Sequence, residues 1–444
     1  MTGFVEVPDV PHYWLTNVRI PHCFLKPEDG LEPIPSRQVS PHREELVAAD
    51  VEIMAGAISR ILPAGTTHLA DTHGVNLGQG LIWPCFVDMH THLDKGHTWP
   101  RSPNPDGTFS AALTTVLEDH KNWQPDELYH RMEFGLKCSY AHGTQAIRTH
   151  LDSFGPLAQQ NFEVFDQLRR QWCDRIILQA VCLVSLDYFL TPAAAALAEL
   201  VAGFDGVLGG VAYMNENLVA QLDQIFTLAK RYGLDLDFHA DESLNPDDIT
   251  LRYIAEAALR HDFQGDITCG HCCSLSVQPP EVVEKTLSLA KAANIGIVSL
   301  PMCNLYLQDR QTGHTPRYRG VTLLHELHKR NMTVALASDN CRDPFYAYGD
   351  HDGLEVFKQS IRIGHLDHPF SHWPKSLTSR PAQLMGLDNI GYLAPEVTAD
   401  FICFKARSLN ELVARHQCDR VVIRKGQSIH TKLPDYSELD RWIN

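Results

Sequence analysis

The chain has 444 residues, of which 44% are hydrophobic and 21% charged, a composition typical of a compact globular protein. Lys and Arg number 38 against 54 Asp and Glu, so the formal net charge is −16, and no Lys/Arg-rich run offsets it. Such a chain repels nucleic-acid phosphates and anionic lipid surfaces, which argues against nucleic-acid and membrane partners and favours a small-molecule substrate.

The chain begins with a segment that is β-rich and non-helical. Residues 1–8 lack the basic and apolar regions of a secretory signal, and no apolar run in the chain is long enough to span a bilayer, so we expect a cytoplasmic protein. Strand-like pieces follow at 13–20 and 51–61, broken by Pro and Gly.

From residue 81 onward the sequence predicts repeated βα units. The apolar run 81–87 is the first expected strand, and seven more begin near Thr144, Arg175, Gly206, Leu234, Asp266, Ile295 and Thr333, at spacings close to thirty residues. Helical periodicity covers 128–142 and 217–232, which end at Gly143 and Gly233. Eight such units predict a (β/α)8 TIM barrel, with a catalytic domain at 83–390.

The end of the chain returns to short strand-like pieces, at 401–404 and 420–424. We expect residues 1–82 and 391–444 to combine into one small β-sandwich domain formed from both termini. The polar stretch 433–444 is expected to wrap the surface. Twelve cysteines are scattered through the chain, and its one CxxC, at 269–272, has no second pair, so reduced thiols are expected and a redox role is the minor alternative.

Residues of metal-ligand type follow the expected strands, where the loops of a barrel converge on one mouth. His90 and His92 follow the first strand as His-x-His, a spacing that puts both rings on one face of an extended chain. His239 and Asp339 end two later strands. Any one of 24 histidines is more often structural, but the coincidence of four such residues favours a catalytic divalent metal with an open position for water.

Two further residues extend this site. Glu242 lies three positions after His239, close enough to move a proton between water and a ring nitrogen, whereas its neighbour Asp241 is interpreted as a loop-bonding residue. His271 ends the next strand along the chain.

The motif His90-Thr91-His92, preceded by Phe86-Val87-Asp88, resembles the metal-dependent amidohydrolase superfamily. The runs at 145–152, 239–242, 304–308, 338–340 and 343–346 narrow this resemblance to the bacterial cytosine deaminase branch, over about residues 80–405.

The resemblance implies a barrel that holds one divalent ion, Zn²⁺ or Fe²⁺. By position, His90, His92, His239 and Asp339 match the family's ligands, Glu242 its proton shuttle and His271 the histidine that orients water. The fourth-strand run at 206–214 lacks the lysine that bridges two metals in many members. Ser185 stands where the branch has a ring-binding glutamine, and Asn340 where it has a carboxylate, so both changes affect ring recognition.

Other residues are expected at the substrate. Gln308 belongs to one of the resembling runs, and Trp99 and Phe345, with Tyr306, are candidate stacking walls for a flat ring, although each is more often simply core. The Pro- and Gly-rich segment 93–121 is interpreted either as a lid over the barrel mouth or as an ordered insertion.

We therefore predict a hydrolytic deaminase of a cytosine-like nucleobase or related amino-substituted N-heterocycle, which releases ammonia through metal-activated hydroxide, as a monomer or a homo-oligomer. One alternative is an amidohydrolase that cleaves an N-alkyl-amine or cyclic amide bond of a triazine- or creatinine-type substrate. An inactive metal-binding scaffold is an alternative of another class.

Overall fold

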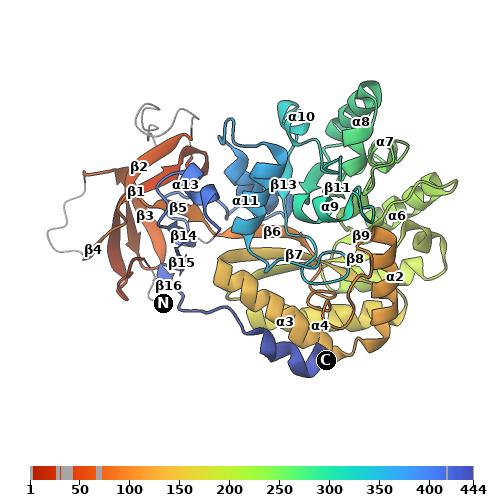
Figure 1. The fold of residues 1–444 in the computed structure, drawn as a ribbon, viewed down its shortest axis with the longest axis horizontal. Helices are drawn as coiled ribbons and strands as arrows, with labels where there is room; N and C mark the ends of the chain where they lie inside the picture. Colours follow the sequence, from red (N-terminus) through yellow and green to blue (C-terminus); the bar gives the residue numbers. More distant parts are fainter. Residues whose placement is uncertain (1–3, 27–30, 32–43, 67–72, 417–418, 444) are drawn as a thin grey trace. The chain divides into compact units, whose positions relative to one another are not determined.

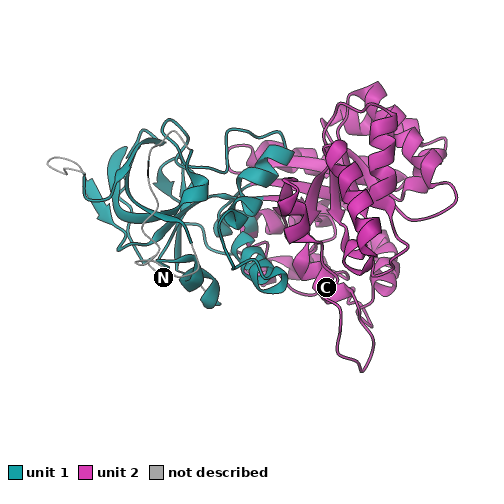
Figure 2. Ribbon diagram, turned by 90° about the horizontal axis from the view of Figure 1, so that it is seen from above, with its two compact units in different colours: residues 1–87, 139–145, 353–433 teal, residues 88–138, 146–352, 434–444 magenta. Residues whose placement is uncertain are grey.

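A computed structural model describes residues 4–26, 31, 44–66, 73–416 and 419–443. The chain is a mixed α/β protein that divides into two compact units (Figure 2). Residues 1–87, 139–145 and 353–433 form the first unit, and residues 88–138, 146–352 and 434–444 form the second. The boundaries expected from sequence differ from this division at 83–87, 139–145, 353–390 and 434–444, and they stay a prediction.

The first unit contains a sheet of eight strands that come from both ends of the chain (Figure 1). Its order is β16-β15-β14-β5-β1-β2-β3, with β4 paired to β1. The strands are β1 (His12–Pro21), β2 (Leu46–Met54), β3 (Ala57–Pro63), β4 (His73–Asn76), β5 (Leu81–Pro84), β14 (Phe401–Phe404), β15 (Arg420–Arg424) and β16 (Gln427–Ser428).

Pairing of β14 with β5 joins the two ends of the sequence. The two strands run antiparallel, with Phe401 opposite Pro84 and Phe404 opposite Leu81. All residues of both strands are buried. The expected strand-like piece 51–61 is two strands, because Ala55 and Gly56 adopt positive φ and turn the chain into a hairpin.

The second unit carries two parallel sheets, in the orders β6-β7-β8 and β13-β12-β11-β10-β9. Single parallel bridges continue them, from Val181 to Val207 at one edge and from Thr91 to Asp339 at the other. The strands are β6 (Phe86–Thr91), β7 (Thr144–Asp152), β8 (Ile177–Leu183), β9 (Leu208–Val211), β10 (Leu236–Ala240), β11 (Ile267–His271), β12 (Gly296–Ser299) and β13 (Val334–Leu336).

The expected strands recur within two residues of their predicted starts, with one correction. The apolar run 81–87 is not one strand: residues 81–84 form β5 in the eight-stranded sheet, and Phe86 begins β6, which pairs with β7. Pro84 ends β5 because proline has no N–H to donate to a ladder. The chain thus changes sheets at Cys85.

Helices separate these strands, and the two predicted in detail are present. Gly143 and Gly233 follow α3 and α6 in left-handed conformation, with φ of 97° and 68°. The helices are α2 (Phe109–Asp119), α3 (Pro125–His142), α4 (Pro156–Trp172), α5 (Ala194–Gly203), α6 (Leu218–Tyr232), α7 (Thr250–Arg260), α8 (Pro280–Ala292), α9 (Pro301–Leu307), α10 (Leu324–Lys329), α11 (Gly353–Gly364), α12 (Ser379–Leu384), α13 (Leu409–Ala414) and α14 (Asp440–Ile443). Short 3-10 turns are η1 (His22–Phe24), η3 (His120–Asn122), η4 (Leu186–Leu190), η5 (Cys273–Val277), η6 (Trp373–Leu377) and η7 (Tyr436–Leu439).

The final stretch of the chain, expected to be a polar segment on the surface, also contributes buried apolar side chains. Leu439 and Ile443 are buried against Phe134 and Cys138 of α3, which fixes η7 and α14 to the second unit. Among the described residues, no helix combines the length and apolar character needed to cross a bilayer. The described cysteines are all free thiols, and Cys418 lies outside the described residues.

Candidate active site

The four expected ligand residues converge in the second unit. His90 and His92 lie at the end of β6, His239 lies in β10, and Asp339 follows β13. His90 Nε2 is 3.2 Å from His239 Nε2 and 3.6 Å from Asp339 Oδ1. His92 Nε2 is 3.4 Å from His239 Nε2 and 3.2 Å from Asp339 Oδ1. Donors about 2.1 Å from a tetrahedral divalent metal lie about 3.4 Å apart, so this spacing fits a single ion.

The electrostatics of the cluster also fit a cation. All four side chains are buried, between 0 and 5% exposed. Burial, together with neighbouring positive groups, holds the pKa of His90, His92 and His239 well below the usual value, so the rings are neutral, the form that binds metals. Lone pairs of converging Nε2 atoms repel one another, and a cation between them removes this repulsion.

Backbone and side-chain contacts from β6 fix the position of Asp339. The Asp339 N–H donates to the His90 carbonyl over 2.9 Å, and Thr91 Oγ1 donates to the Asp339 carbonyl over 2.8 Å. One residue earlier, Ser338 donates its N–H and its hydroxyl to the Asp88 carboxylate. Asp339 has a φ of 65°, a strained conformation that these contacts maintain.

His271, at the end of β11, faces the same cluster. Burial lowers the pKa of His271 to about 3, so its ring is neutral. Asn304 Nδ2 donates to His271 Nδ1 over 2.9 Å, which leaves the ring proton on Nε2. Asn304 lies in one of the runs that resemble the family, and the sequence predicted no role for it. Its place one turn into α9, beside a strand-end histidine, is visible only in the fold.

Glu242 follows β10, and its Oε1 lies 3.3 Å from His271 Nδ1. Burial, with the negative charge of Asp339, raises the pKa of Glu242 well above its usual value. A protonated carboxyl at this place can deliver a proton. Asp241 points elsewhere, because it accepts hydrogen bonds from the N–H and hydroxyl of Thr250 at the start of α7, as expected for a loop-bonding residue.

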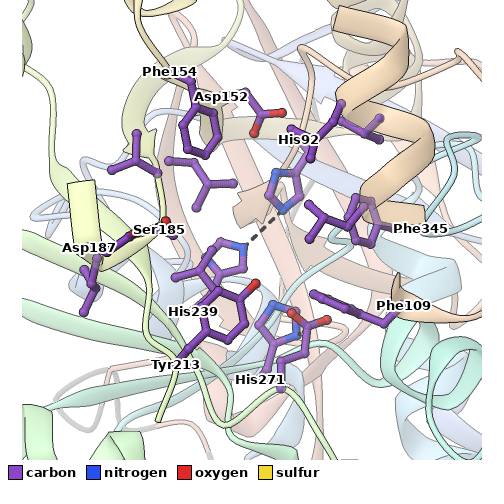
Figure 3. Close-up of a pocket in the computed structure, with 18 of the residues that line it drawn as sticks. His92, Phe109, Asp152, Phe154, Ser185, Asp187, Tyr213, His239, His271 and Phe345 are labelled. Carbon is purple, nitrogen blue, oxygen red and sulfur yellow. Dashed lines mark hydrogen bonds and ion pairs between the residues drawn. The ribbon is translucent and has the colours of Figure 1, made fainter. Parts of the chain in front are cut away.

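A cavity of about 690 Å³ opens beside this cluster (Figure 3). Phe109 and Phe345 lie on one side of the imidazoles of the cluster in this view, and Ser185 on the other. The ligand residues His92, His239 and Asp339, together with Glu242, His271, Ser185, Asn340 and Phe345, are among the lining residues.

Two residues expected at the substrate do not line this cavity. Trp99 is half-buried, and its backbone N–H donates to the Arg342 carbonyl. Gln308 Nε2 donates to the backbone carbonyl of Glu242 over 3.4 Å, so it contacts the loop that carries Glu242 instead of the cavity. Asn340 lines the cavity, yet its Nδ2 is engaged by Asp343 Oδ2 at 2.7 Å.

The cavity also contains residues that sequence reasoning missed. Lys95 lines it and pairs with Asp152, with Nζ 2.7 Å from Oδ1. Phe109, Phe154 and Tyr213 add aromatic surface. The sequence offered one signal that Lys95 lies at the site, namely its position three residues after His92. Its partner Asp152 lies 57 residues away, so the pair emerges only when β6 and β7 are adjacent.

The segment 93–121 lies at the cavity, since Phe109, Leu113, Val116 and Leu117 of α2 line it. Arg101 anchors the segment through its guanidinium, which donates to Asp119 over 2.8 and 2.9 Å and to Glu127 over 2.8 Å. These contacts describe an ordered insertion, and the idea of a mobile lid stays a prediction.

Comparison with known proteins places this geometry in a family. A profile described as "Amidohydrolase family" matches residues 168–430. A pterin deaminase from Rhizobium rhizogenes is 47% identical over 443 residues, 99% of each chain. The chain belongs to the amidohydrolase family. N-isopropylammelide isopropyl amidohydrolase from a Pseudomonas species is 24% identical over 79% of this chain and 86% of its own.

A solved structure shares the fold of this amidohydrolase. It is a 5-methylcytosine deaminase from Klebsiella pneumoniae, with a TM-score of 0.80 and 24% identity, over 95% of this chain and 98% of that one. The comparisons confirm the expected family, the hydrolase acting on non-peptide C–N bonds, and the hydrolytic deaminase of an N-heterocycle. Members of the family are metal-dependent, in keeping with the donor cluster described above.

Proposed function

We propose that this amidohydrolase is a pterin deaminase, which replaces the exocyclic amine of a fused bicyclic ring by oxygen and releases ammonia. The observation that carries the proposal is 47% identity to a pterin deaminase over 99% of both chains. The Pseudomonas relative, named for removing an isopropylamine group, is only 24% identical. The expected cytosine-like ring is thereby extended to a larger heterocycle of the same amidine type.

The cavity supports a substrate larger than a pyrimidine. Its volume, about 690 Å³, falls in the range of sites that enclose drug-sized ligands. Phe109 and Phe345 lie with ring centroids 5.5 Å apart at 64°, and both line the cavity. Flat heterocycles pack favourably against such aromatic surface.

We propose further that the two parallel sheets form one (β/α)8 barrel, and that the strands of both ends form the small β-sandwich. The two bridges support a closed ring. We assign one ion, Zn²⁺ or Fe²⁺, to His90, His92, His239 and Asp339. A single ion agrees with β9, where Gly209 and Gly210 occupy the strand and neither position can hold a lysine.

In the proposed reaction, the bound divalent ion would lower the pKa of water so that a nucleophile is available near neutral pH. Asp339 accepts the proton of the attacking water. Glu242 delivers a proton to the ring nitrogen next to the carbon under attack. The Nε2–H of His271 donates to the oxygen on which negative charge develops. The carbon–nitrogen bond then breaks: the proton held by Asp339 leaves with ammonia, and the hydroxyl proton of the new carbonyl oxygen returns to Glu242.

Ammonia release from a substrate panel tests this proposal. Metal-loaded protein is assayed with pterin, 6-substituted pterins, cytosine, an N-alkylated triazine and creatinine, and amine products are identified. We expect ammonia, with kcat/KM highest for a pterin. Isopropylamine from the triazine as the preferred reaction would support the N-alkyl-amine alternative. Absence of any product from the whole panel would overturn the proposal and favour the inactive scaffold.

A further inference from the structure

A second group of metal-type donors lies apart from the catalytic cluster. His97 lies in the loop after β6, and Cys341 and His351 lie in the loop after β13. One ring nitrogen of each histidine and the sulfur of Cys341 all lie within 4.8 Å of one another. The three residues are between 1 and 3% exposed. Imidazole and thiol together form the donor set that zinc prefers.

The buried imidazole of His97 lacks a polar partner among the described residues, although the His97 backbone N–H donates to the Cys341 carbonyl over 3.0 Å. Within the part of the chain that the structure describes, neither its Nδ1 nor its Nε2 has a hydrogen-bond partner. The ring packs edge-on against Phe134, with centroids 4.8 Å apart, and lies 5.4 Å from the ring of His351. Leaving a buried imidazole unsatisfied is unfavourable, and a bound cation removes this cost.

Neighbouring elements pack closely around the ring of His351 in this second cluster. A Cβ at Gly135 of α3 would lie 3.1 Å from His351 Nε2 and 2.9 Å from Leu93 Cδ2. Glycine inside a helix is less stable than alanine, and here it leaves room for the close approach of the ring. Tyr436 stacks on Phe134 with centroids 5.4 Å apart, so the C-terminal segment covers this side of the cluster.

The local charges permit a divalent cation once the thiol is ionised. Arg131 and Arg342 lie close enough to lower the pKa of His97, secondary to burial. Arg131 is paired with Glu127, with NH2 3.0 Å from Oε2. Burial, with the charge of Asp350, raises the pKa of the Cys341 thiol, and a metal reverses this by binding the thiolate. Glu127 is shared between Arg131 and Arg101, so the further negative charge near the cluster is that of Asp350 and of the Cys341 thiolate that a metal would bind.

We propose that His97, Cys341 and His351 bind a second divalent ion of the zinc type, which ties the loop after β6 to the loop after β13. The same two loops carry catalytic ligands, since His97 follows His92 by five positions and Cys341 follows Asp339 by two. The second ion would therefore hold these two loops together.

Cobalt substitution tests this proposal without reference to turnover. The full-length protein is depleted of metal, loaded with Co²⁺, freed of excess ion and analysed for metal. We expect about two equivalents per chain, and a near-ultraviolet thiolate-to-cobalt charge-transfer band. Among the donor groups found in the described residues, only that of His97, Cys341 and His351 contains sulfur, so we assign the band to the second cluster.

Two variants assign the band to its residue. Cys341→Ala should lose the band and about one equivalent of cobalt, while Cys403→Ala, which removes a buried thiol from β14 of the first unit, should keep both. If Cys341→Ala does not fold, the wild-type measurement still decides. Two results for the wild-type protein would overturn the proposal. One is about one equivalent of cobalt per chain with no charge-transfer band, as expected if only water fills the second cluster. The other is about two equivalents of cobalt without the band.

Discussion

At the scale of single residues, burial gives neighbouring side chains in one cavity different protonation states. The imidazoles of His90, His92 and His239 are held neutral, which suits metal ligands. Glu242 has its pKa raised by the same burial, which suits a proton donor. Burial therefore meets two opposite requirements: it keeps lone pairs available for a cation, and it keeps a proton available for the substrate.

Replacing Glu242 tests the role of its proton. Glu242→Gln keeps the shape of the side chain and removes the acid, so we expect kcat to fall by about 10²–10⁴-fold with unchanged metal content. Steady-state kinetics and elemental analysis measure both quantities. Glu216→Gln, at an exposed carboxylate that also lines the cavity, is the matched control and should keep its activity. Near-full turnover of Glu242→Gln would favour cleavage of an amide or N-alkyl bond.

Ser185 is the residue through which ring preference can be tested. It lines the cavity and its hydroxyl donates to Asp187, so a longer amide here reaches further towards a bound ring. Ser185→Gln should shift the ratio of kcat/KM for cytosine over pterin upward by about tenfold. Asn340 is the less suitable position, because a carboxylate there would face Asp343 at hydrogen-bonding distance. An unchanged ratio for Ser185→Gln would mean that this side chain does not meet the ring.

At the scale of elements, short strands accept only certain residues because neighbouring backbones approach closely. In β9, a Cβ at Gly209 would lie against the carbonyl oxygen of Asp237 in β10 and 3.1 Å from that of Cys182 in β8. Both neighbours are backbone atoms of paired or adjoining strands, so neither can move aside. The same crowding explains why this strand carries glycines.

A methyl group at Gly209 should therefore disturb the strand. We expect Gly209→Ala to lower the free energy of unfolding by about 3 kcal/mol, measured by chemical denaturation of the metal-loaded protein. Gly203→Ala, at the end of α5 where nothing lies within 4 Å of the added carbon, should be neutral or slightly stabilising. Equal stability of the two variants would contradict the close approach.

In the eight-stranded sheet, a cross-strand ion pair joins β2 to β3. Glu52 lies directly opposite Arg60 and accepts two hydrogen bonds from its guanidinium, at 2.7 and 2.9 Å. The Arg60 guanidinium, helped by His12, lowers the pKa of Glu52 to about 2 from an ordinary 4.5. Ionised Glu52 therefore stabilises this sheet fully above about pH 4.5, and its contribution is lost as the pH falls towards 2.

Glu52→Gln should reveal this dependence. Near pH 7 we expect the variant to lose about 1 kcal/mol of protection in the β2–β3 hairpin, and the difference from wild type should shrink as the pH falls below about 4.5. Hydrogen exchange of the amides of β2 and β3 measures it locally. A difference that stays constant from about pH 7 to 3 would show that the charge of Glu52 is not its cause.

At the scale of the whole molecule, the order of elements in the chain differs from their order in space. The first unit draws on three separate stretches of sequence, and its sheet needs β14 beside β5. The second unit likewise ends with residues 434–444, whose apolar side chains are buried against α3. Neither unit is complete until the last part of the chain is present.

Truncation after residue 400 should show that the first unit depends on the strands at the end of the chain. Loss of β14, β15 and β16 leaves the buried edge of β5 unpaired, and unpaired strand edges promote aggregation. We expect the shortened chain to accumulate as insoluble protein, judged by fractionation and by the far-ultraviolet circular dichroism of any soluble part. A truncated protein that remains folded and monomeric would show that β14 is dispensable.

The sequence by itself determined the local elements and the group of donor-type side chains that the fold brings together. Strand starts such as Thr144 and Asp266, the helix that stops at Gly233, and the donors His90, His92, His239 and Asp339 were predictable, because periodicity and residue type report on the immediate neighbourhood of the chain. Where a local signal was absent, prediction failed: nothing in the run 81–87 shows that its halves belong to different sheets.

Tertiary structure alone decided what depends on distant residues. The Lys95–Asp152 pair, the aromatic lining of the cavity and the cluster of His97, Cys341 and His351 each join residues separated by long stretches of chain. Trp99 and Gln308 were expected at the substrate from their residue type and position in the sequence, yet neither lines the cavity. Which strands pair, and therefore which side chains meet, is set by the packing of the whole domain, and no window of sequence contains that information.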